Sequence, residues 1–391
     1  MSANTLAWND VETKMATQRI IDFLATRRPS GPCLVVDLDV VRDNYVAFER
    51  ALPQSRIFYA VKANPAPEVL RLLAGLGSSF DTASVAEIEM ALDAGASAER
   101  ISYGNTIKKE RDIARAYELG VDLYAVDCVE EVEKIARAAP GARVFCRVLT
   151  DGEGAEWPLS RKFGCVPAMA VDVLRRAAAL GLDAYGVSFH VGSQQTDLAA
   201  WDRALTDAKN VFSALAAEGI VLRMVNMGGG FPTRYLRDVP TAQAYGEAIF
   251  DALSRHFGNR LPETIIEPGR GMVGNAGVIK AEVVLVSKKA DNDNVRWVYL
   301  DIGKFGGLAE TMDEAIRYPI ATPHDGEETT PCILAGPTCD SADVLYEKTP
   351  YPLPISLTIG DEVLIEGTGA YTTTYSAVAF NGFEPLRAYV I

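Results

Sequence analysis

The chain has 391 residues, of which 48% are hydrophobic and 23% charged, an ordinary composition for a globular protein of about two domains. Its formal net charge of −14 disfavours nucleic acid and anionic membranes, so we expect neither as a partner. The N-terminus lacks a basic-plus-apolar signal pattern, and no apolar run is long enough to span a bilayer. The six cysteines contain no Cys-x-x-Cys pair, so we expect reduced thiols in a cytoplasmic protein and no metal.

The chain up to residue 33 predicts one helix at Thr17–Thr26, which a segment rich in Pro and Gly ends. A strand at Cys33–Leu38 and a helix at Leu38–Leu52 follow. Strand and helix patterns then alternate, and eight short apolar runs have the character of buried parallel strands. These predicted strands are Ile57–Val61, Ser79–Asp81, Ile101–Gly104, Leu123–Val126, Val144–Leu149, Tyr185–His190, Leu222–Met227 and Thr264–Glu267.

This alternation predicts an α/β fold, and eight strands separated by helices predict a (β/α)8 TIM barrel over residues 34–275. A doubly wound open sheet is the competing fold. The strand count favours the barrel, as does the absence of a Gly-x-Gly-x-x-Gly after the first strand. After Gly274 helical patterns become scarce and turn signals frequent. Residues 276–391, together with 1–33, therefore predict a second, mainly antiparallel β-sandwich or β-barrel domain.

Lys62 stands at the C-terminal end of the first predicted barrel strand, after the apolar run Ile57–Val61 and before Asn64 and Pro65. Apolar neighbours lower the pKa of a lysine, because desolvation penalises its charged form. A neutral lysine amine is a nucleophile that can form a Schiff base with an aldehyde cofactor. The alternative is a lysine whose side chain extends from the strand end into water.

Other polar side chains stand at the ends of the predicted strands, where the active sites of such barrels lie. Asp81 ends the second strand, Arg147 lies in the fifth, and His190 ends the sixth. Gly228–Gly230 follows the seventh strand and Arg270 the eighth. Close backbone approach at the glycines and a bidentate guanidinium predict a phosphate site, with a tight turn as the alternative for the glycines.

For Glu267 and His190, a purely structural role is an alternative to a role in a site. Glu267, at the end of the eighth strand, needs a partner to stay ionised, either a pyridinium nitrogen or a nearby Arg or Lys. His190 suits either a site or core packing, and the Gly192-Ser193 sequence after it favours a site. The other histidines, His256 and His324, are assigned to the surface.

In the second domain, Gly336-Pro337-Thr338 leads into Cys339 and Asp340, a turn that presents a thiol beside a carboxylate. A buried structural cysteine is the usual explanation of a lone Cys, but Asp340 does not suit an apolar pocket. Tyr371 offers a phenol that can bond a phosphate. No predicted strand end carries a cluster of His and carboxylates, which disfavours a metal-dependent hydrolase.

Six motifs follow one another along the chain: Tyr-Ala-Val-Lys-Ala-Asn, Ser-Phe-His-Val-Gly-Ser, Gly-Gly-Gly-Phe-Pro, Glu-Pro-Gly-Arg, Gly-Pro-Thr-Cys-Asp-Ser and Gly-Ala-Tyr-Thr. In this order they resemble the fold-type III pyridoxal-phosphate (PLP) decarboxylases of ornithine, lysine, arginine and diaminopimelate, which have an alanine racemase-like barrel. The resemblance runs from about Cys33 to the C-terminus. Gly-Pro-Thr-Cys-Asp and the Phe-Asn-Gly-Phe at 380–383 are most similar to the ornithine type.

The resemblance implies roles for the candidate residues. Lys62 would bond covalently to PLP, and His190 would stack on its ring. Glu267 would pair with the ring nitrogen, and Cys339 would protonate the α-carbon after CO2 leaves. Asp340 would bind the distal ammonium of the substrate. The residues implied to support or bind the cofactor are Asp81, Arg147, Ser193, Gly229, Gly230, Gly269, Arg270 and Tyr371.

The implied reaction is decarboxylation of L-ornithine to putrescine and CO2 in polyamine biosynthesis. The alternatives are a bifunctional lysine/ornithine decarboxylase, which also converts lysine to cadaverine, or a different decarboxylase or racemase on the same fold. In this family two subunits pair head to tail, so a homodimer would share its active sites. Trp157–Gly164 resembles the family's mobile active-site loop. The eukaryotic ornithine enzymes place a Tyr-Asp pair near the substrate tail, where this chain has Asp313-Glu314. We expect Glu314 to take the acidic role.

Two other functions use the same scaffold. A racemase needs a second base opposite Lys62, whereas this chain offers Cys339-Asp340 in a decarboxylase context. A regulator of the antizyme-inhibitor kind keeps the fold and loses the chemistry. The presence of Lys62, Cys339 and the other catalytic residues disfavours such a regulator.

Overall fold

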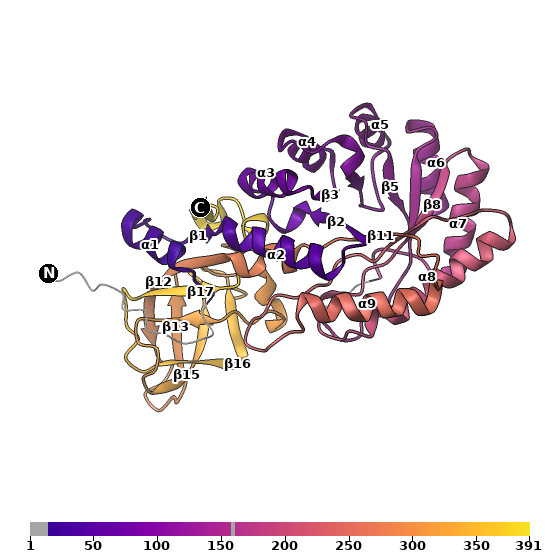
Figure 1. Cartoon of the computed structure of the whole chain (residues 1–391). Helices are drawn as coiled ribbons and strands as arrows, with labels where there is room; N and C mark the ends of the chain where they lie inside the picture. The colour runs from indigo at the N-terminus through magenta and orange to yellow at the C-terminus, as the bar shows by residue number, and fades with distance from the viewer. Residues whose placement is uncertain (1–14, 158–160) are drawn as a thin grey trace. The chain divides into compact units, whose positions relative to one another are not determined.

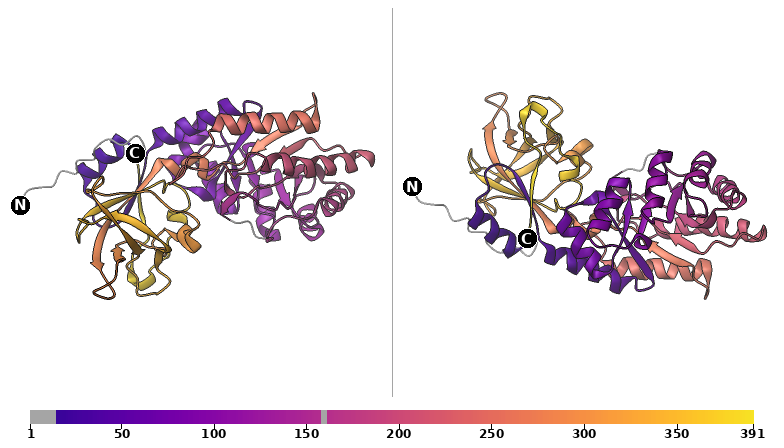
Figure 2. Two further views of the ribbon diagram at one scale, coloured as in Figure 1. Left: turned by 90° about the horizontal axis from the view of Figure 1, so that it is seen from below. Right: turned by 90° about the horizontal axis from the view of Figure 1, so that it is seen from above.

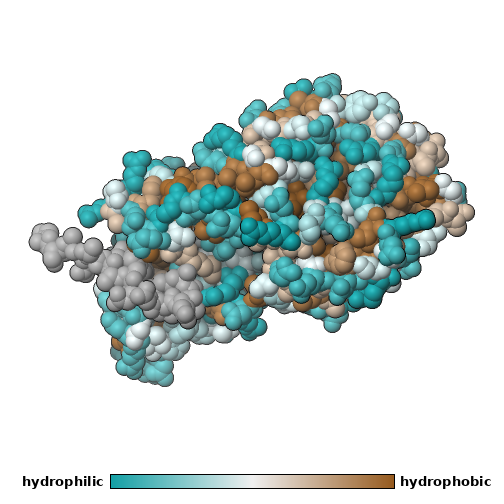
Figure 3. All heavy atoms as spheres, viewed as in Figure 1, coloured by the Kyte–Doolittle hydropathy of each residue, from teal (hydrophilic) through white to brown (hydrophobic). Residues whose placement is uncertain are grey.

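The computed structural model describes residues 15–157 and 161–391, which form two compact units (Figure 1). The sheet unit contains the chain up to Val40, Thr233–Asp238 and Val273–Ile391, and the barrel unit contains Val41–Pro232 and Val239–Met272. Within the described residues, none of the helices combines the length and the apolar character needed to cross a membrane. On the face shown in Figure 3, hydrophilic side chains cover much of the surface and apolar ones are scattered between them.

The barrel unit is built on a closed barrel of eight parallel strands, in which β11 pairs with β2 to complete the ring. The strands in order around the barrel are β2 (Ser55–Ala60), β3 (Ser79–Thr82), β4 (Ile101–Tyr103), β5 (Leu123–Val126), β6 (Arg143–Arg147), β8 (Asp183–Ser188), β10 (Met224–Asn226) and β11 (Glu263–Ile266). The predicted (β/α)8 barrel is confirmed. Each strand overlaps its predicted range, because short apolar runs bounded by turns mark buried parallel strands clearly.

Helices alternate with these strands and lie outside them (Figures 1 and 2). The helical segments from α2 to η3 are α2 (Leu38–Ala51), η1 (Val61–Ala63), α3 (Pro67–Leu76), α4 (Val85–Asp93), η2 (Ala98–Arg100), α5 (Glu110–Glu118), α6 (Val129–Ala138), α7 (Pro167–Ala179), α8 (Ala200–Ala217), α9 (Ala242–Phe257), α10 (Arg270–Val273) and η3 (Gly274–Ala276). A separate two-stranded ribbon joins β7 (Ala155–Trp157) to β9 (Ser193–Gln195). Phe58, Phe145, Met224 and Ile265 pack together in the barrel core.

The sheet unit contains a separate, mainly antiparallel sheet, as predicted. Its strands are β1 (Cys33–Val36), β12 (Gly277–Ser287), β13 (Arg296–Leu300), β14 (Ile320–Ala321), β15 (Thr329–Ala335), β16 (Val344–Pro354), β17 (Glu362–Glu366) and β18 (Arg387–Val390). The β1–β18 and β13–β15 pairs are parallel. Its helical segments are α1 (Gln18–Arg27), η4 (Ala309–Glu314), η5 (Thr373–Tyr375) and η6 (Phe380–Gly382).

Strand β1 comes from the N-terminal part of the chain but belongs to this sheet. It lies between β12, with which it pairs antiparallel, and β18, with which it pairs in parallel. Its side chains are fully buried, and Cys33 and Val35 pack with Ile20 of α1. The predicted boundary at residue 34 therefore falls inside a strand of the sheet.

Candidate active site

The residues predicted from the barrel strands stand where those strands end. Lys62 lies in η1, directly after β2, and Asp81 lies in β3. Arg147 is the last residue of β6, His190 follows β8 by two residues, and Glu267 follows β11 directly. Because parallel strands end at the same edge of a barrel, these side chains meet at one mouth.

The charged groups at this mouth interact with one another. Burial raises the pKa of Asp81 well above its usual range, and the Glu267 carboxylate raises it further while Lys62 lowers it. Burial also raises the pKa of Glu267, whereas the hydrogen bond from Asn226 and the charges of Lys62 and Arg147 lower it. A cationic ligand between two such carboxylates would bind favourably, because its positive charge lowers both pKa values.

Asp81 depends on the absence of a side chain at Gly104. A Cβ on Gly104 would lie 1.8 Å from Oδ1 of Asp81, far inside van der Waals contact. The hydroxyl of Ser102 donates to the same Oδ1 at 3.4 Å. Gly104 thus makes room for the carboxylate beside Lys62, a requirement that nothing in the sequence pattern indicates.

Glu87 is a further carboxylate near Lys62 that sequence analysis did not single out. It lies in the first turn of α4, three residues after the N-cap Ser84, which is the usual place for a capping glutamate. Its carboxylate accepts the Ala83 N–H at 2.7 Å. Burial raises the pKa of Glu87, and Lys62 lowers it. One side chain thus caps a helix and interacts with the lysine.

The surroundings of His190 favour the neutral form of its imidazole. Burial, with the Arg147 and Lys62 charges nearby, holds the pKa of His190 well below its usual range. Its Nδ1 accepts the N–H of Gly192 at 3.0 Å, which places the ring proton on Nε2. A Cβ on Gly229 would lie 3.2 Å from that Nε2, so the glycine leaves space beside the ring.

The glycine run after β10 brings the backbone close to the loop after β8. A Cβ on Gly228 would lie 2.1 Å, and one on Gly230 2.6 Å, from carbonyl oxygens of that loop. Both glycines have positive φ, 65° and 110°, a region that side chains disfavour. Arg270 follows Gly269 at the start of α10 and is 3% exposed. It donates from Nε and Nη2 to Ser193 Oγ, each at 3.2 Å.

In the sheet unit, Cys339 and Asp340 lie on the turn after β15, and both side chains are exposed. The Cys339 N–H donates to Oδ1 of Asn381 at 3.0 Å. Oδ1 of Asp340 accepts the Ala342 N–H at 2.8 Å. The thiol and the carboxylate are thus presented at the surface on a turn held by one hydrogen bond within the turn and one to Asn381, which is distant in the sequence.

Asp313 and Glu314 lie at the end of η4 with left-handed backbones, φ 53° and 60°. The Glu314 carboxylate accepts N–H groups of residues 347–349 and pairs with Arg317 at 2.8 Å. The Asp313 side chain is 85% exposed and pairs with Lys348 at 3.1 Å. These contacts favour a structural role for Glu314 over the predicted contact with a substrate tail, and leave Asp313 as the more accessible acid.

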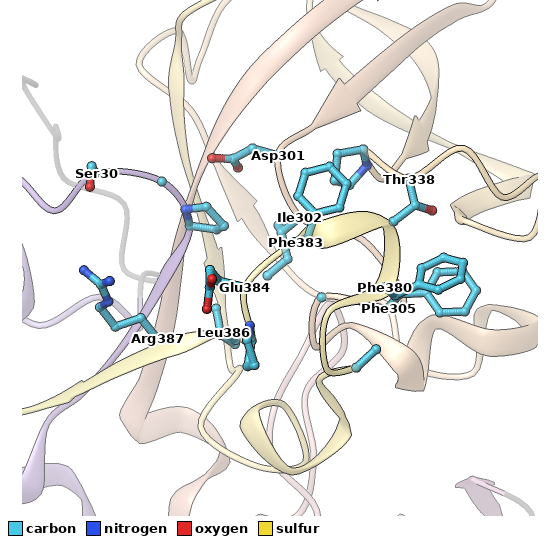
Figure 4. A pocket seen from close by; sticks show the side chains of 16 residues that line it. Ser30, Asp301, Ile302, Phe305, Thr338, Phe380, Phe383, Glu384, Leu386 and Arg387 are labelled. Carbon is cyan, nitrogen blue, oxygen red and sulfur yellow. The ribbon is translucent and has the colours of Figure 1, made fainter.

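A cavity of about 580 Å³ lies in the sheet unit beside the turn that carries Cys339 (Figure 4). Thr338, the residue before Cys339, lines it, as do the Phe305 and Phe380 rings, whose centroids are 4.6 Å apart. Tyr371 has a left-handed backbone, φ 56°, and its ring lies 5.9 Å from that of Tyr375. Of the predicted loop Trp157–Gly164, residues 158–160 lie outside the described part of the chain.

Comparison with known proteins shows the family of this chain. Residues 38–274 match the family model "Pyridoxal-dependent decarboxylase, pyridoxal binding domain", and the chain belongs to this family. The lysine/ornithine decarboxylase of Selenomonas ruminantium is 37% identical over 94% of this chain and 91% of that protein. The ornithine decarboxylase of Caenorhabditis elegans is 34% identical over 92% and 87%. The crystal structure of SrLDC with PLP and cadaverine superposes with a TM-score of 0.85 at 35% identity, over 96% and 94%.

The chain is therefore a PLP-dependent amino-acid decarboxylase, and its own residues fit that cofactor. The neighbours of the Gly228–Gly230 backbone leave no room for side chains, and this backbone lies close to the loop that carries Ser193. Ser193 is hydrogen-bonded to Arg270, so a hydroxyl and a cation lie together where a phosphate can bind. Glu267 offers a carboxylate for a protonated ring nitrogen. In the part of the chain that the structure describes, no group of three or more His, Cys, Asp or Glu side chains could hold a metal ion.

Proposed function

We propose that this protein decarboxylates L-ornithine to putrescine and CO2, as a cytoplasmic step of polyamine biosynthesis, with L-lysine as an alternative substrate. The observation that carries the proposal is the meeting of Lys62, Asp81 and Glu267 at the barrel mouth. The substrate class is supported by the relatives named as lysine/ornithine and ornithine decarboxylases. The predicted domain of residues 34–275 carries the cofactor in this proposal.

PLP, when bound, supplies an electron sink for the electron pair that remains on the α-carbon when CO2 leaves. Lys62 is assigned as the amine that bonds to it, and Asp81 and Glu87 balance the charge of this amine. Glu267 would accept a hydrogen bond from the protonated ring nitrogen. A neutral His190 would lie against the ring without adding a positive charge that would oppose ring protonation.

The phosphate is assigned to Arg270, Ser193 and the backbone of Gly229 and Gly230, with the Tyr371 hydroxyl as a further donor. A guanidinium that is 3% exposed binds an anion strongly, because little water competes for its N–H groups. The Arg270 side chain is already oriented by Ser193. Gly269 and Arg147 complete the cofactor side of the mouth. Arg147 carries a positive charge close enough to lower the pKa of Glu267.

Cys339 is assigned as the acid that returns a proton to the α-carbon. Its thiol is exposed on the sheet unit, as are the apolar side chains of Tyr375, Val378 and Phe383. Exposed apolar side chains on the unit that carries the thiol suit a surface that another subunit covers. We assign the protein as a homodimer in which Cys339 and Asp340 of one subunit complete the site around Lys62 of the other.

The distal ammonium of the substrate is assigned to Asp340, with Asp313 as a second acid. Both carboxylates are exposed in the sheet unit and can form a charge-assisted hydrogen bond with an ammonium. Glu314 holds the segment that carries Asp313, through its bonds to residues 347–349 and to Arg317. The spacing between α-carbon and acid would then set the preference between ornithine and the longer lysine.

The test is CO2 release by the purified protein with added PLP. Ornithine, lysine, arginine and meso-diaminopimelate are offered separately at equal concentration, and Asp340→Asn is run beside the parent protein. We expect release from ornithine above the others and a raised KM for ornithine in Asp340→Asn. No release from any of the four, despite bound PLP, would refute the proposed function.

A further inference from the structure

Asn226, the last residue of β10, is a buried amide at the mouth of the barrel. It is 1% exposed, and sequence analysis did not single it out. Its Oδ1 accepts the N–H of Gly228 at 2.9 Å, and its Nδ2 donates to Oε1 of Glu267. One side chain thus connects the start of the glycine run to the carboxylate assigned to the cofactor ring.

The backbone determines which way the Asn226 amide is turned. The Gly228 N–H can only donate, so the side-chain atom that faces it must be the carbonyl oxygen. The NH2 group then faces Glu267, and an NH2 group can only donate. The hydrogen-bond partners therefore settle the orientation of this amide.

The Asn226 amide donates to the Glu267 carboxylate, whose pKa is raised by some of its surroundings and lowered by others. Burial favours the neutral form of Glu267. Lys62 in η1 and Arg147 in β6 favour its ionised form through their charges. Among the described residues, Asn226 is the side chain that adds a hydrogen bond to it. A donor on Oε1 favours the ionised form and also fixes the position of the group.

The same amide restrains the glycine run. Gly228 is held by Asn226 on its N–H, and its carbonyl oxygen accepts the Glu267 N–H at 2.8 Å. A Cβ on Gly229 would lie 2.7 Å from the Glu267 carbonyl oxygen. The Glu267 carboxylate, which is proposed to meet the cofactor ring, and the Gly228–Gly230 backbone, which is proposed to bind the phosphate, are therefore joined by hydrogen bonds through Asn226.

We propose that Asn226 is a positioning residue that orients Glu267 and keeps it ionised, so that the carboxylate meets the cofactor ring as an acceptor. The inference rests on the proposed pairing of Glu267 with the ring nitrogen, and it does not depend on which amino acid is the substrate. Loss of the amide weakens cofactor binding through both the ring and the glycine run.

Asn226→Asp is the sharpest test, because the new carboxyl group has the same shape and donates to Glu267 only while it is protonated. Two adjoining carboxyl groups share a proton in a buried site, which raises the pKa of one of them. Below that raised pKa the variant should resemble the parent protein. Above it, PLP affinity and kcat should fall about ten- to a hundredfold, the worth of a hydrogen bond to a charged group.

Asn226→Ala should show this loss at every pH, because it never offers a donor. Two readouts besides activity follow the cofactor site: the dissociation constant for PLP, and the absorbance of bound PLP as a function of pH. In the protein without cofactor, the infrared carboxylic-acid band that Glu267→Gln removes reports the ionisation of Glu267. That band should persist to higher pH in Asn226→Ala.

Ser55→Ala is the matched control. Ser55 and Thr264 share a hydrogen bond of 2.8 Å near the N-terminal ends of β2 and β11, away from the barrel mouth. Loss of this bond should leave all cofactor readouts unchanged. Equal, pH-independent losses in Asn226→Asp and Asn226→Ala would overturn the proposal, since they would indicate packing alone. Variants of Asn226 that match Ser55→Ala would overturn it as well.

Glu267→Gln separates this inference from the proposal on which it rests. If Glu267→Gln leaves the absorbance of bound PLP unchanged, Glu267 does not pair with the ring, and the inference falls with that pairing. If Glu267→Gln changes the absorbance and the Asn226 variants do not, only the inference fails. Decarboxylation of an amino acid other than ornithine would change the proposed substrate and leave this inference standing.

Discussion

The two units of the molecule hold the side chains of the proposed site in different ways. In the barrel unit, Lys62, Asp81 and Glu267 stand at strand ends whose relative places follow from the parallel register. In the sheet unit, Cys339 and Asp313 lie on turns that are shaped by individual hydrogen bonds and left-handed residues. A barrel site should therefore be sensitive to packing at the strand ends. A turn site should be sensitive to the loss of single polar contacts.

The largest expected effect tests whether the two units serve one active site. Lys62→Ala and Cys339→Ala should each lower activity at least about a hundredfold, because the amine and the acid are both needed. A one-to-one mixture should recover about a quarter of the parent activity, since half of the dimers are mixed and each has one intact site. CO2 release after subunit exchange measures the recovery.

Cys339→Ala should unfold at the same urea concentration as the parent protein, because Cys339 is exposed. Lys62→Ala should unfold at a lower urea concentration, because Lys62 lowers the pKa of the buried Asp81 and Glu267. Mixed dimers are verified by two different affinity tags. If such dimers form and no activity returns, the barrel and sheet sites do not complement each other between subunits.

The next effect concerns packing at a strand end. Gly104→Ala would place a Cβ 1.8 Å from Oδ1 of Asp81, so the carboxylate or the strand must move. We expect a loss of about 1–3 kcal/mol in the free energy of unfolding, as for other overpacked sites. Activity should fall as well, because Asp81 no longer faces Lys62. Urea denaturation and CO2 release measure the two effects.

Gly75→Ala is the control for this change. No atom lies within 4 Å of a Cβ at Gly75, which is inside helix α3, so alanine should raise stability by about 0.5–1 kcal/mol. An active, stable Gly104→Ala protein would contradict the expectation that the barrel mouth is sensitive to packing at its strand ends.

A smaller effect separates two neighbouring acids of the sheet unit. Glu314→Gln weakens the pair with Arg317 and the bonds to residues 347–349, and should cost about 1 kcal/mol of unfolding free energy. Asp313→Asn removes an exposed pair and should leave stability unchanged, while altering the ratio of lysine to ornithine turnover. Thermal unfolding and kcat/KM for both substrates measure this. The reverse pattern would restore Glu314 as the acid that meets the substrate.

The smallest effect is a pH dependence of the sheet unit. Burial raises the pKa of Asp301 to about 6. The folded protein thus binds this proton more tightly than the unfolded chain, and the associated stability is lost as pH rises from about 4 to about 6. Asp301→Asn should be more stable than the parent by up to about 1 kcal/mol at neutral pH, and equal to it at low pH. Urea denaturation across this range measures the difference, and a gain that is the same at every pH would contradict it.

The barrel was predictable because its signals repeat along the sequence. Short apolar runs mark the strands, and residues that directly follow such runs, Lys62 and Glu267, must appear at one edge. The glycine run 228–230 could be recognised in the same way, since it follows a predicted strand. These inferences needed only local pattern and the rule that parallel strands end together.

Sequence analysis missed residues at the site whose local sequence pattern already had an ordinary structural explanation. Glu87 reads as a capping residue and Asn226 as an ordinary strand end, and only the three-dimensional structure shows what they contact. Gly104 was missed because the sequence does not show that Asp81 needs its space. The contact of Glu314 with the substrate stays a prediction, and the sequence does not show the bonds that Glu314 accepts from residues 347–349, because they depend on the path of β16.

The pairing of β1 with β18 also bears on how the protein is made. Cys33 lies opposite Arg387, so two neighbouring strands are separated by almost the whole chain. During synthesis every strand of the barrel leaves the ribosome before β18 does, because β11 ends at Ile266. Long-range pairing of this kind forms late. In a nascent chain, the edge of β1 that pairs with β18 therefore stays unpaired until β18 has left the ribosome.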